Sequence, residues 1–230
     1  MAQNVPVREA MPIDKERRIT RLTLIGLFSF IGFCAIAMTF QLDAVGVIDG
    51  WIIQSIQQQE APFWTGFMKL LSFIGSGQIV TVFSGIAALL LINLYKRRTE
   101  ALFFLVTVIG SALLNILLKL YFQRERPDLH TLITETGYSF PSGHSMNAFT
   151  FYGIVSYLFW RRIQSKRAKS LLLGFSSLMI VLIGISRVYL GVHYPSDIAG
   201  AYLISGVWLI LMIKLYRYIK KRKVKYPGSN

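Results

Sequence analysis

The chain has 230 residues, of which 53% are hydrophobic, and its mean hydropathy is +0.50. This composition excludes an ordinary soluble domain, because apolar stretches long enough to cross a bilayer as helices run almost from end to end. The formal net charge of +14 would suggest nucleic acid in a soluble protein. Here the basic residues form short clusters between apolar runs, which indicates membrane topology and no nucleic-acid partner. The single cysteine, Cys34, allows no intramolecular disulfide and no cysteine metal cluster.

In chain order, a polar and basic N-terminal segment precedes the first apolar stretch. No small-residue cleavage site follows that stretch, so we interpret it as a retained helix and not a signal peptide. Segment 43–75 then mixes charged residues with Trp51 and Trp64, which favour the membrane–water boundary, and predicts one or two short interfacial helices. The predicted spans cover residues 22–42, 77–95, 101–118, 145–160, 171–186 and 197–215. The predicted fold class is therefore an all-α integral membrane bundle of six helices.

The predicted organisation is a cytoplasmic basic segment at 1–21, one six-helix membrane domain at 22–215 and a cytoplasmic basic tail at 216–230. With the N-terminus inside, 20 of the 25 Lys and Arg residues fall in inner segments, as the positive-inside rule requires. An even number of spans returns the C-terminus to the same side. The sequence thus predicts a multi-pass protein of the cell (inner) membrane with both termini in the cytoplasm.

The basic residues left outside concentrate in two loops, 119–143 and 187–196. In the predicted topology these loops share the extracytoplasmic face. All three histidines of the chain lie in these loops or directly beside them: His130, His144, which follows the first loop, and His193. Topology alone therefore predicts a cationic, histidine-bearing site at the outer mouth of the bundle.

Three short patterns occupy these loops. They are Lys119, six residues, then Arg126-Pro127; Pro141-Ser142-Gly143-His144; and Ser186-Arg187, five residues, His193, three residues, then Asp197. Three fixed cations suit a phosphoryl group, whose charge spreads over its oxygens during transfer. The second pattern opens an apolar helix, where free N–H groups form an anion site that a glycine lets the backbone approach closely. The predicted phosphate-binding residues are Lys119, Arg126, Ser142, Gly143 and Arg187.

His193 and Asp197 predict a nucleophile and the carboxylate that orients it. A carboxylate on one ring nitrogen fixes the tautomer and leaves the other nitrogen free to attack. Pro195 argues against an unbroken helix between the two residues and favours a loop that enters the last helix, with Asp197 in its first turn. His144 is the predicted general acid for the departing oxygen.

These patterns, in this order and at these spacings, resemble the signature of the type 2 phosphatidic acid phosphatase superfamily, which also includes vanadium haloperoxidases and glucose-6-phosphatase. The motifs span 119–197, and every element of the signature is present. The resemblance implies a phosphohistidine on His193, orientation by Asp197 and leaving-group protonation by His144, with no metal and no cofactor. The likeness is to small bacterial members that act on phosphatidylglycerophosphate, phosphatidate or undecaprenyl pyrophosphate, which implies a lipid phosphate as substrate and membrane lipids as surroundings.

Other polar residues are interpreted as structural. His130, Glu125, Asp128 and Glu135 match no motif and are expected on a solvated surface, and Asn115 is expected to form an interhelical hydrogen bond. Two other functions stay open: a phosphotransferase that uses the same site with an acceptor other than water, and a non-catalytic lipid transporter. The sequence assigns neither a preferred lipid nor an oligomeric state.

Overall fold

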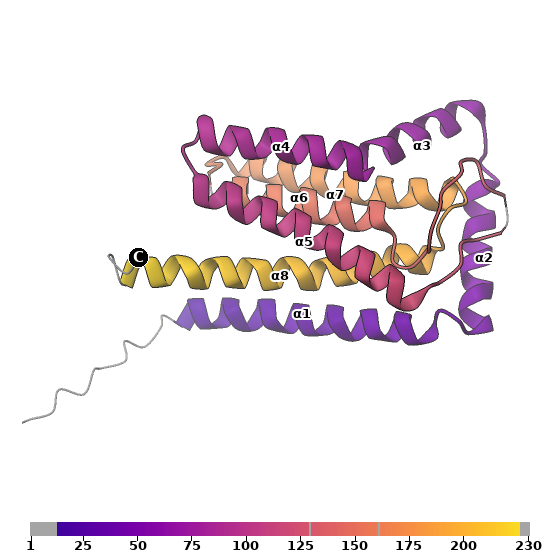
Figure 1. Ribbon diagram of the computed structural model, residues 1–230, viewed down its shortest axis with the longest axis horizontal. Helices are drawn as coiled ribbons and strands as arrows, with labels where there is room; N and C mark the ends of the chain where they lie inside the picture. The colour runs from indigo at the N-terminus through magenta and orange to yellow at the C-terminus, as the bar shows by residue number, and fades with distance from the viewer. Residues whose placement is uncertain (1–12, 129, 161, 226–230) are drawn as a thin grey trace, which may run out of the picture.

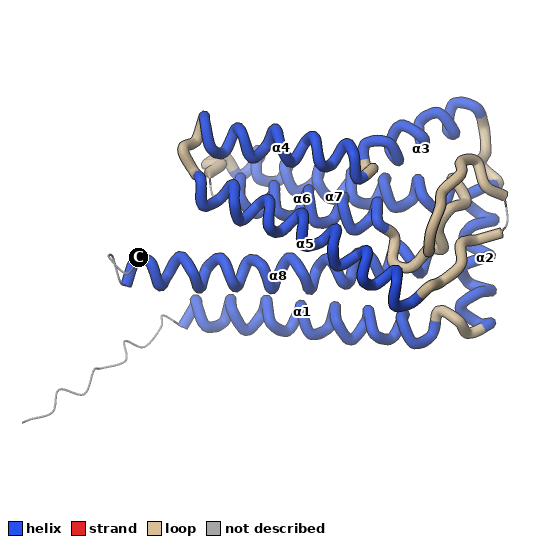
Figure 2. The backbone as a smooth tube through the Cα atoms, in the orientation of Figure 1, coloured by secondary structure: helices blue, strands red, loops and turns tan. Residues whose placement is uncertain are grey.

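The structure, a computed structural model, describes residues 13–128, 130–160 and 162–225. Within these ranges every regular element is a helix (Figures 1 and 2), which confirms the predicted all-α class. Parts of the two basic terminal segments, residues 1–12 and 226–230, lie outside the described residues. The helices are α1 (Ile13–Thr39), α2 (Asp43–Gln57), α3 (Pro62–Ile74), α4 (Gly77–Asn93), α5 (Arg98–Phe122), α6 (Gly143–Trp160), α7 (Lys166–Tyr189) and α8 (Pro195–Lys225).

Helix α6 lies at the centre of the bundle, where it packs against α4, α5, α7 and α8. Helix α1 packs along α8, and α2 lies across one end of the bundle, nearly at right angles to the long helices (Figure 1). This end also receives the long loop between α5 and α6 and the short loop between α7 and α8. The fold therefore gathers both motif-bearing loops beneath α2.

The distribution of side chains is that of a membrane protein. Large apolar side chains point outwards along the long helices, among them Phe28, Leu117 and Leu171, which are 70%, 64% and 73% exposed. Small hydroxyl side chains face each other inside, where Ser111 pairs with Thr150 at 2.8 Å between their oxygens. Lipid tails solvate the outer face as well as a protein core would, so hydrogen bonds and close packing hold the helices together. The chain is a multi-pass membrane protein.

The described part of the chain contains fewer candidate membrane spans than the six predicted from the sequence. Four described helices are long and apolar enough to cross a membrane: α1 from Thr20, α5, α7 and α8 to Lys221. A fifth span results if α3 and α4, bent by 51° at their junction, are counted as one. Helix α6 is not among them, because its first turns carry His144, Ser145 and Asn147, which lower its mean hydropathy. The count of six therefore remains a prediction.

Four helices, α5 to α8, extend beyond the predicted bounds, whereas α1 and α4 end two or three residues before them. Segment 43–75 forms two helices, α2 and α3, within the one or two expected. Helix α7 begins at Lys166 instead of 171, and α8 continues to Lys225, so the predicted division at residue 216 lies inside a helix. Positive charge does not stop a helix, because long basic side chains extend from its end towards water and lipid headgroups.

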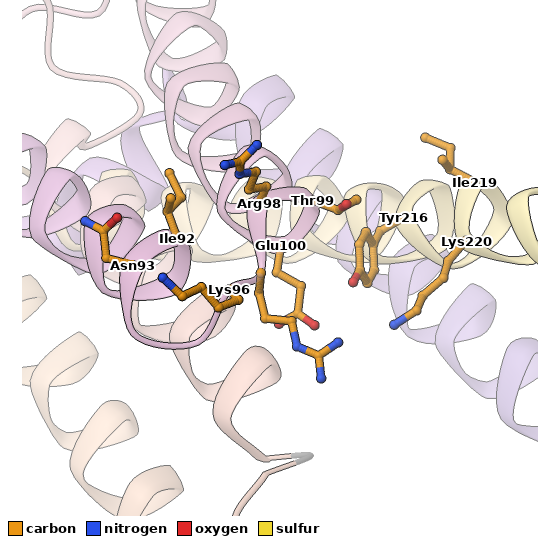
Figure 3. A pocket seen from close by; sticks show the side chains of 10 residues that line it. Ile92, Asn93, Lys96, Arg98, Thr99, Glu100, Tyr216, Ile219 and Lys220 are labelled. Atoms are coloured by element: carbon orange, nitrogen blue, oxygen red, sulfur yellow. The ribbon is translucent and has the colours of Figure 1, made fainter. Parts of the chain in front are cut away.

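A cavity of about 630 Å³ opens at the end of the bundle opposite to α2, between the α4–α5 turn and the end of α8 (Figure 3). Its charged lining is Lys96, Arg97, Arg98, Glu100 and Lys220. No residue of the three sequence patterns lines it, so this end of the molecule carries basic charge without the motif chemistry.

Candidate active site

The two motif-bearing loops contact each other directly, which confirms that they share one end of the bundle. Arg126 Nη1 donates to the carbonyl of Val192 at 2.8 Å, and the amide of Leu132 donates to the carbonyl of Leu190 at 3.0 Å. The second pattern joins them, since the Ser142 amide donates to the main-chain carbonyl of Asp197 at 3.3 Å. Three segments far apart in sequence thus build one site.

Local sequence sets the course of the 187–197 segment. Gly191 has a φ of +73°, and a Cβ at this position would lie 2.0 Å from the carbonyl oxygen of His130, so only glycine fits where the chain leaves α7. Helix α8 begins at Pro195, a residue whose fixed φ and missing N–H suit the first helical position. Asp197 lies in that first turn, as predicted, and its Oδ2 accepts from the Tyr194 amide at 2.9 Å in the manner of a capping box.

The contacts of His193 define its tautomer. Nδ1 lies 3.2 Å from Asp197 Oδ2 and 3.2 Å from Ser139 Oγ, while Ser139 itself donates to Asp197 Oδ2. Nε2 lies 3.3 Å from Arg126 Nη1. A guanidinium can only donate, so Nε2 is the acceptor and the ring proton sits on Nδ1, facing the carboxylate. The free lone pair of His193 therefore points towards the arginine.

Burial keeps His193 neutral. The side chain is 1% exposed. This burial lowers the pKa of the imidazole to about 4, although Asp197 raises it, and the charges of Arg187 and Arg126 lower it further. Near neutral pH the ring is therefore uncharged, as a nitrogen nucleophile must be.

The three predicted cations come from different elements, and one of them, Arg126, contacts this nitrogen. Arg126 comes from the α5–α6 loop, where Nε and Nη2 donate to the carbonyls of Gly137 and Thr136 at 2.9 and 3.1 Å. Arg187, from α7, is fully buried and donates to Ser72 and Glu135. Its Nε–H has no hydrogen-bond partner among the described residues. Lys119, at the end of α5, donates to the carbonyl of Tyr138.

Glu135 corrects the sequence analysis, which expected it on a solvated surface. Its side chain is 26% exposed and pairs with both Arg187 and Arg126, the latter at 3.6 Å. Burial alone would raise the pKa of this carboxyl, but the charge of Arg187 and its hydrogen bond, with Arg126, hold the pKa below its ordinary value. An anion thus already lies between two of the cations in the free protein. In the sequence, Glu135 is an acidic residue between two basic patterns. This arrangement is too common to indicate an ion pair.

The N-terminus of α6 carries the second pattern. Ser142 is fully buried and its hydroxyl accepts from the Ser145 amide at 3.4 Å, so it caps the helix. Asn115 of α5 donates to the Pro141 carbonyl at 2.9 Å and to Sδ of Met146 in α6 at 3.2 Å, and the second contact is the predicted interhelical hydrogen bond. A Cβ at Gly143 would lie 3.0 Å from Asn115 Oδ1, so this glycine makes room for a neighbouring helix as well as leaving the helix end open. His144 follows in the first turn of α6.

Sequence reasoning missed three further residues at the site, Ser139, Arg124 and Asp49. Ser139 touches both His193 and Asp197, as described above. Arg124 belongs to none of the three patterns, yet it donates to Asp197 Oδ1 at 2.7 Å and to Asp49 Oδ2 at 3.0 Å. No pattern indicated Asp49, because its partners lie 75 and 147 residues away. His130, by contrast, is an exposed residue paired with Glu60 at 2.8 Å.

Comparison with known proteins agrees with this geometry. A family model described as PAP2 superfamily matches residues 100–221, a range that contains all three patterns. Phosphatidylglycerophosphatase B of Bacillus subtilis (strain 168) is 30% identical over 191 residues, covering 80% of this chain and 91% of that protein.

Two solved structures share the fold. The transmembrane PAP2-type phosphatidylglycerolphosphate phosphatase from Bacillus subtilis has a TM-score of 0.77 and 28% identity, with 84% of this chain and 96% of that chain covered. The Aquifex aeolicus protein LpxE has a TM-score of 0.57 and 26% identity, with coverage of 71% and 93%. The family match, the relatives and the assembled motifs lead to one conclusion: the chain belongs to the PAP2 superfamily of membrane lipid phosphatases.

Proposed function

We propose that the protein hydrolyses a lipid phosphate or pyrophosphate ester through a phosphohistidine on His193, without a metal or cofactor. The observation that carries this proposal is the orientation of His193. Its Nδ1 proton is held by Asp197, and its Nε2 lone pair faces Arg126. A neutral, oriented nitrogen that faces fixed cations is the arrangement that attack on an anionic phosphorus requires.

In the first half-reaction, Nε2 of His193 attacks the phosphorus and forms a P–N bond as the ester P–O bond breaks. The bond electrons go to the leaving oxygen, which takes a proton from His144. A bound phosphate dianion favours the protonated form of that imidazole. Asp197 stabilises the positive charge that develops on the His193 ring.

In the second half-reaction, water attacks the phosphorus and loses a proton to His144. The P–N bond breaks, its electrons return to His193, and inorganic phosphate leaves. Lys119, Arg126, Arg187, the hydroxyl of Ser142 and the amide of Gly143 bind the phosphoryl oxygens in both steps. The unpartnered buried Nε–H of Arg187 supports this role, because such a donor is costly unless a ligand accepts from it.

The proposed substrates are phosphatidylglycerophosphate, phosphatidate and undecaprenyl pyrophosphate. The Bacillus relative is named for the first of these. A site at the end of the bundle (Figure 1), flanked by helices that expose apolar side chains, takes a phosphate at headgroup level while the hydrocarbon chain remains in the bilayer. A lipid rather than a soluble ester is therefore the substrate class that the architecture favours.

We propose that six segments span the cell membrane, with both termini cytoplasmic and the site extracytoplasmic. The basic clusters at the α4–α5 turn, the α6–α7 turn and the end of α8 support this orientation. A single cysteine introduced at His130 in a Cys34→Ala background should react with an impermeant thiol reagent added to intact cells, and one at Lys166 should not. The reverse labelling pattern would invert the assigned orientation.

The test of the function is phosphate release by detergent-purified protein in the presence of EDTA, with the three lipids and a soluble phosphate ester compared. We expect release from the lipids that survives EDTA. Loss of release on chelation, restored by added metal, would contradict the metal-free mechanism. Product that forms only with an added alcohol acceptor would identify a phosphotransferase. Folded protein that forms no product with any acceptor would favour a lipid transporter.

A further inference from the structure

A buried arginine connects the surface helix α2 to the carboxylate beside His193. Arg124, 9% exposed, lies between two acidic side chains that are almost fully buried. Its Nη1 is 2.7 Å from Asp197 Oδ1, and its Nη2 is 3.0 Å from Asp49 Oδ2. A planar guanidinium can bridge two carboxylates at fixed angles, whereas a lysine offers only a point charge.

Aromatic rings hold this guanidinium in place. Its Cζ lies 4.0 Å from the ring centroid of Tyr194 and 4.9 Å from that of Phe40. Tyr194 directly follows His193, and Phe40 directly follows α1. Cation–π contacts of this kind favour one orientation of the arginine plane. The donors of Arg124 are therefore directed at the two carboxylates before substrate binds.

Arg124 acts on both oxygens of Asp197. It donates to Oδ1 through its side chain, and its main-chain carbonyl accepts from the Ser139 amide at 2.7 Å. Ser139 in turn donates to Oδ2, the oxygen that faces Nδ1 of His193. One residue thus fixes the rotation of the carboxylate directly and through its neighbour.

Asp49 completes the arrangement from α2. It is 2% exposed and also accepts from the amide of Ser196 at 2.9 Å and from the Ser196 hydroxyl. Asp49 supplies a second negative charge beside Arg124. The buried guanidinium is therefore neutralised by two carboxylates and not by Asp197 alone. The opposite face of α2 exposes the apolar side chains of Val47 and Trp51, at 71% and 69%. Helix α2 therefore connects an exposed apolar surface to the reaction centre.

We propose that Asp49 and Arg124 are positioning residues for the reaction: they orient Asp197 towards His193 and make α2 part of the active site. This inference rests on the proposed phosphohistidine mechanism. Neither residue belongs to the three sequence patterns, and neither needs to touch the phosphate. Their loss should therefore slow the chemical steps more than it weakens phosphate binding.

The charges also predict how the two substitutions combine. Arg124→Gln alone leaves Asp49 and Asp197 close together and buried without their shared cation, which is strongly unfavourable. Adding Asp49→Asn removes one of these two charges. The second substitution should therefore restore part of the activity and stability that the first removes, although in the wild-type background it is harmful.

The experiment compares kcat, KM and competitive inhibition by inorganic phosphate for Asp49→Asn, Arg124→Lys, Arg124→Gln and the double variant Asp49→Asn/Arg124→Gln. We expect Asp49→Asn and Arg124→Lys each to lower kcat about tenfold, with KM and the phosphate inhibition constant within about twofold. The double variant should exceed Arg124→Gln in kcat. Asp43→Asn, an exposed acid on the same helix, and Glu60→Gln, from an exposed ion pair, are matched controls with wild-type kinetics.

An unchanged kcat in Asp49→Asn would overturn the proposal, as would losses that multiply in the double variant. A parallel rise in KM and in the phosphate inhibition constant would indicate that Asp49 and Arg124 contribute to phosphate binding, and it would also contradict the proposal. If Arg124→Gln does not fold, Arg124→Lys with and without Asp49→Asn decides the same question.

A readout without turnover separates this inference from the proposed function. The chain has three histidines, so ¹⁵N-histidine spectra of the protein can be assigned by single substitution. The Nδ1 and Nε2 shifts report the tautomer and hydrogen bonding of His193 even if no substrate is cleaved. Asp49→Asn and Arg124→Lys should move the His193 signals and Asp43→Asn should not. Unmoved signals would contradict positioning, whereas absence of His193-dependent phosphate release would contradict only the function.

Discussion

Replacing His193 with alanine should lower phosphate release by at least about 10³-fold, the largest effect expected from any single substitution. The imidazole supplies the electron pair that forms the P–N bond, and no other described side chain is oriented by Asp197 at that position. Protein stability should change less, because Asp197 keeps its hydrogen bonds from Ser139, the Tyr194 amide and Arg124 when the ring is removed. The measurement is phosphate release under saturating lipid phosphate, with folding checked by thermal unfolding.

The covalent intermediate gives a second, independent readout. Wild-type protein mixed with radiolabelled substrate and quenched in alkali, which spares P–N bonds, should retain label, and His193→Ala should not. His130→Ala is the matched control, because His130 is an exposed histidine paired with Glu60. It should label and turn over like the wild type. Label that persists in His193→Ala would show that another residue is the nucleophile.

Replacing His144 with glutamine should lower kcat on an alkyl phosphate such as phosphatidate by about 10²–10⁴-fold, the usual contribution of a general acid. An alkoxide leaves poorly without a proton. An aryl ester such as p-nitrophenyl phosphate has a good leaving group, so its first half-reaction should be largely spared. The second half-reaction still needs His144 to accept a proton from water.

His144→Gln should therefore give a burst of p-nitrophenol equal to the enzyme concentration, followed by slow turnover while phosphoenzyme accumulates. Rapid-mixing absorbance measures the burst, and the alkali quench measures the label. His130→Gln should show no such change. Equal losses on alkyl and aryl esters, with no burst, would assign His144 to phosphate binding instead of proton transfer.

Helix α6 shows where hydropathy stops being informative. The apolar character of 145–160 predicted a span, and the structure places a helix there, but at the centre of the bundle. A helix surrounded by other helices has no need for a fully apolar surface, so α6 carries polar side chains such as His144, Ser145 and Asn147, which lower its mean hydropathy. Sequence predicted the element correctly, while its surroundings followed only from packing.

The sequence by itself determined the family patterns, the two loops that meet and the start of the last helix. These features are local: Pro195 fixes the first turn of α8, and four residues separate His193 from Asp197. The clusters of basic residues also predict the orientation of the chain in the membrane, because the positive-inside rule applies to each loop separately.

Only the tertiary structure decided the partners of these residues. Arg124 reaches Asp197 across 73 positions, and Asp49 reaches Ser196 across 147. Glu135, expected at a solvated surface, lies against Arg187. Burial turns such residues into fixed partners, since a charge removed from water must find an opposite charge nearby. That requirement depends on which helices pack together, and no local pattern along the chain records it.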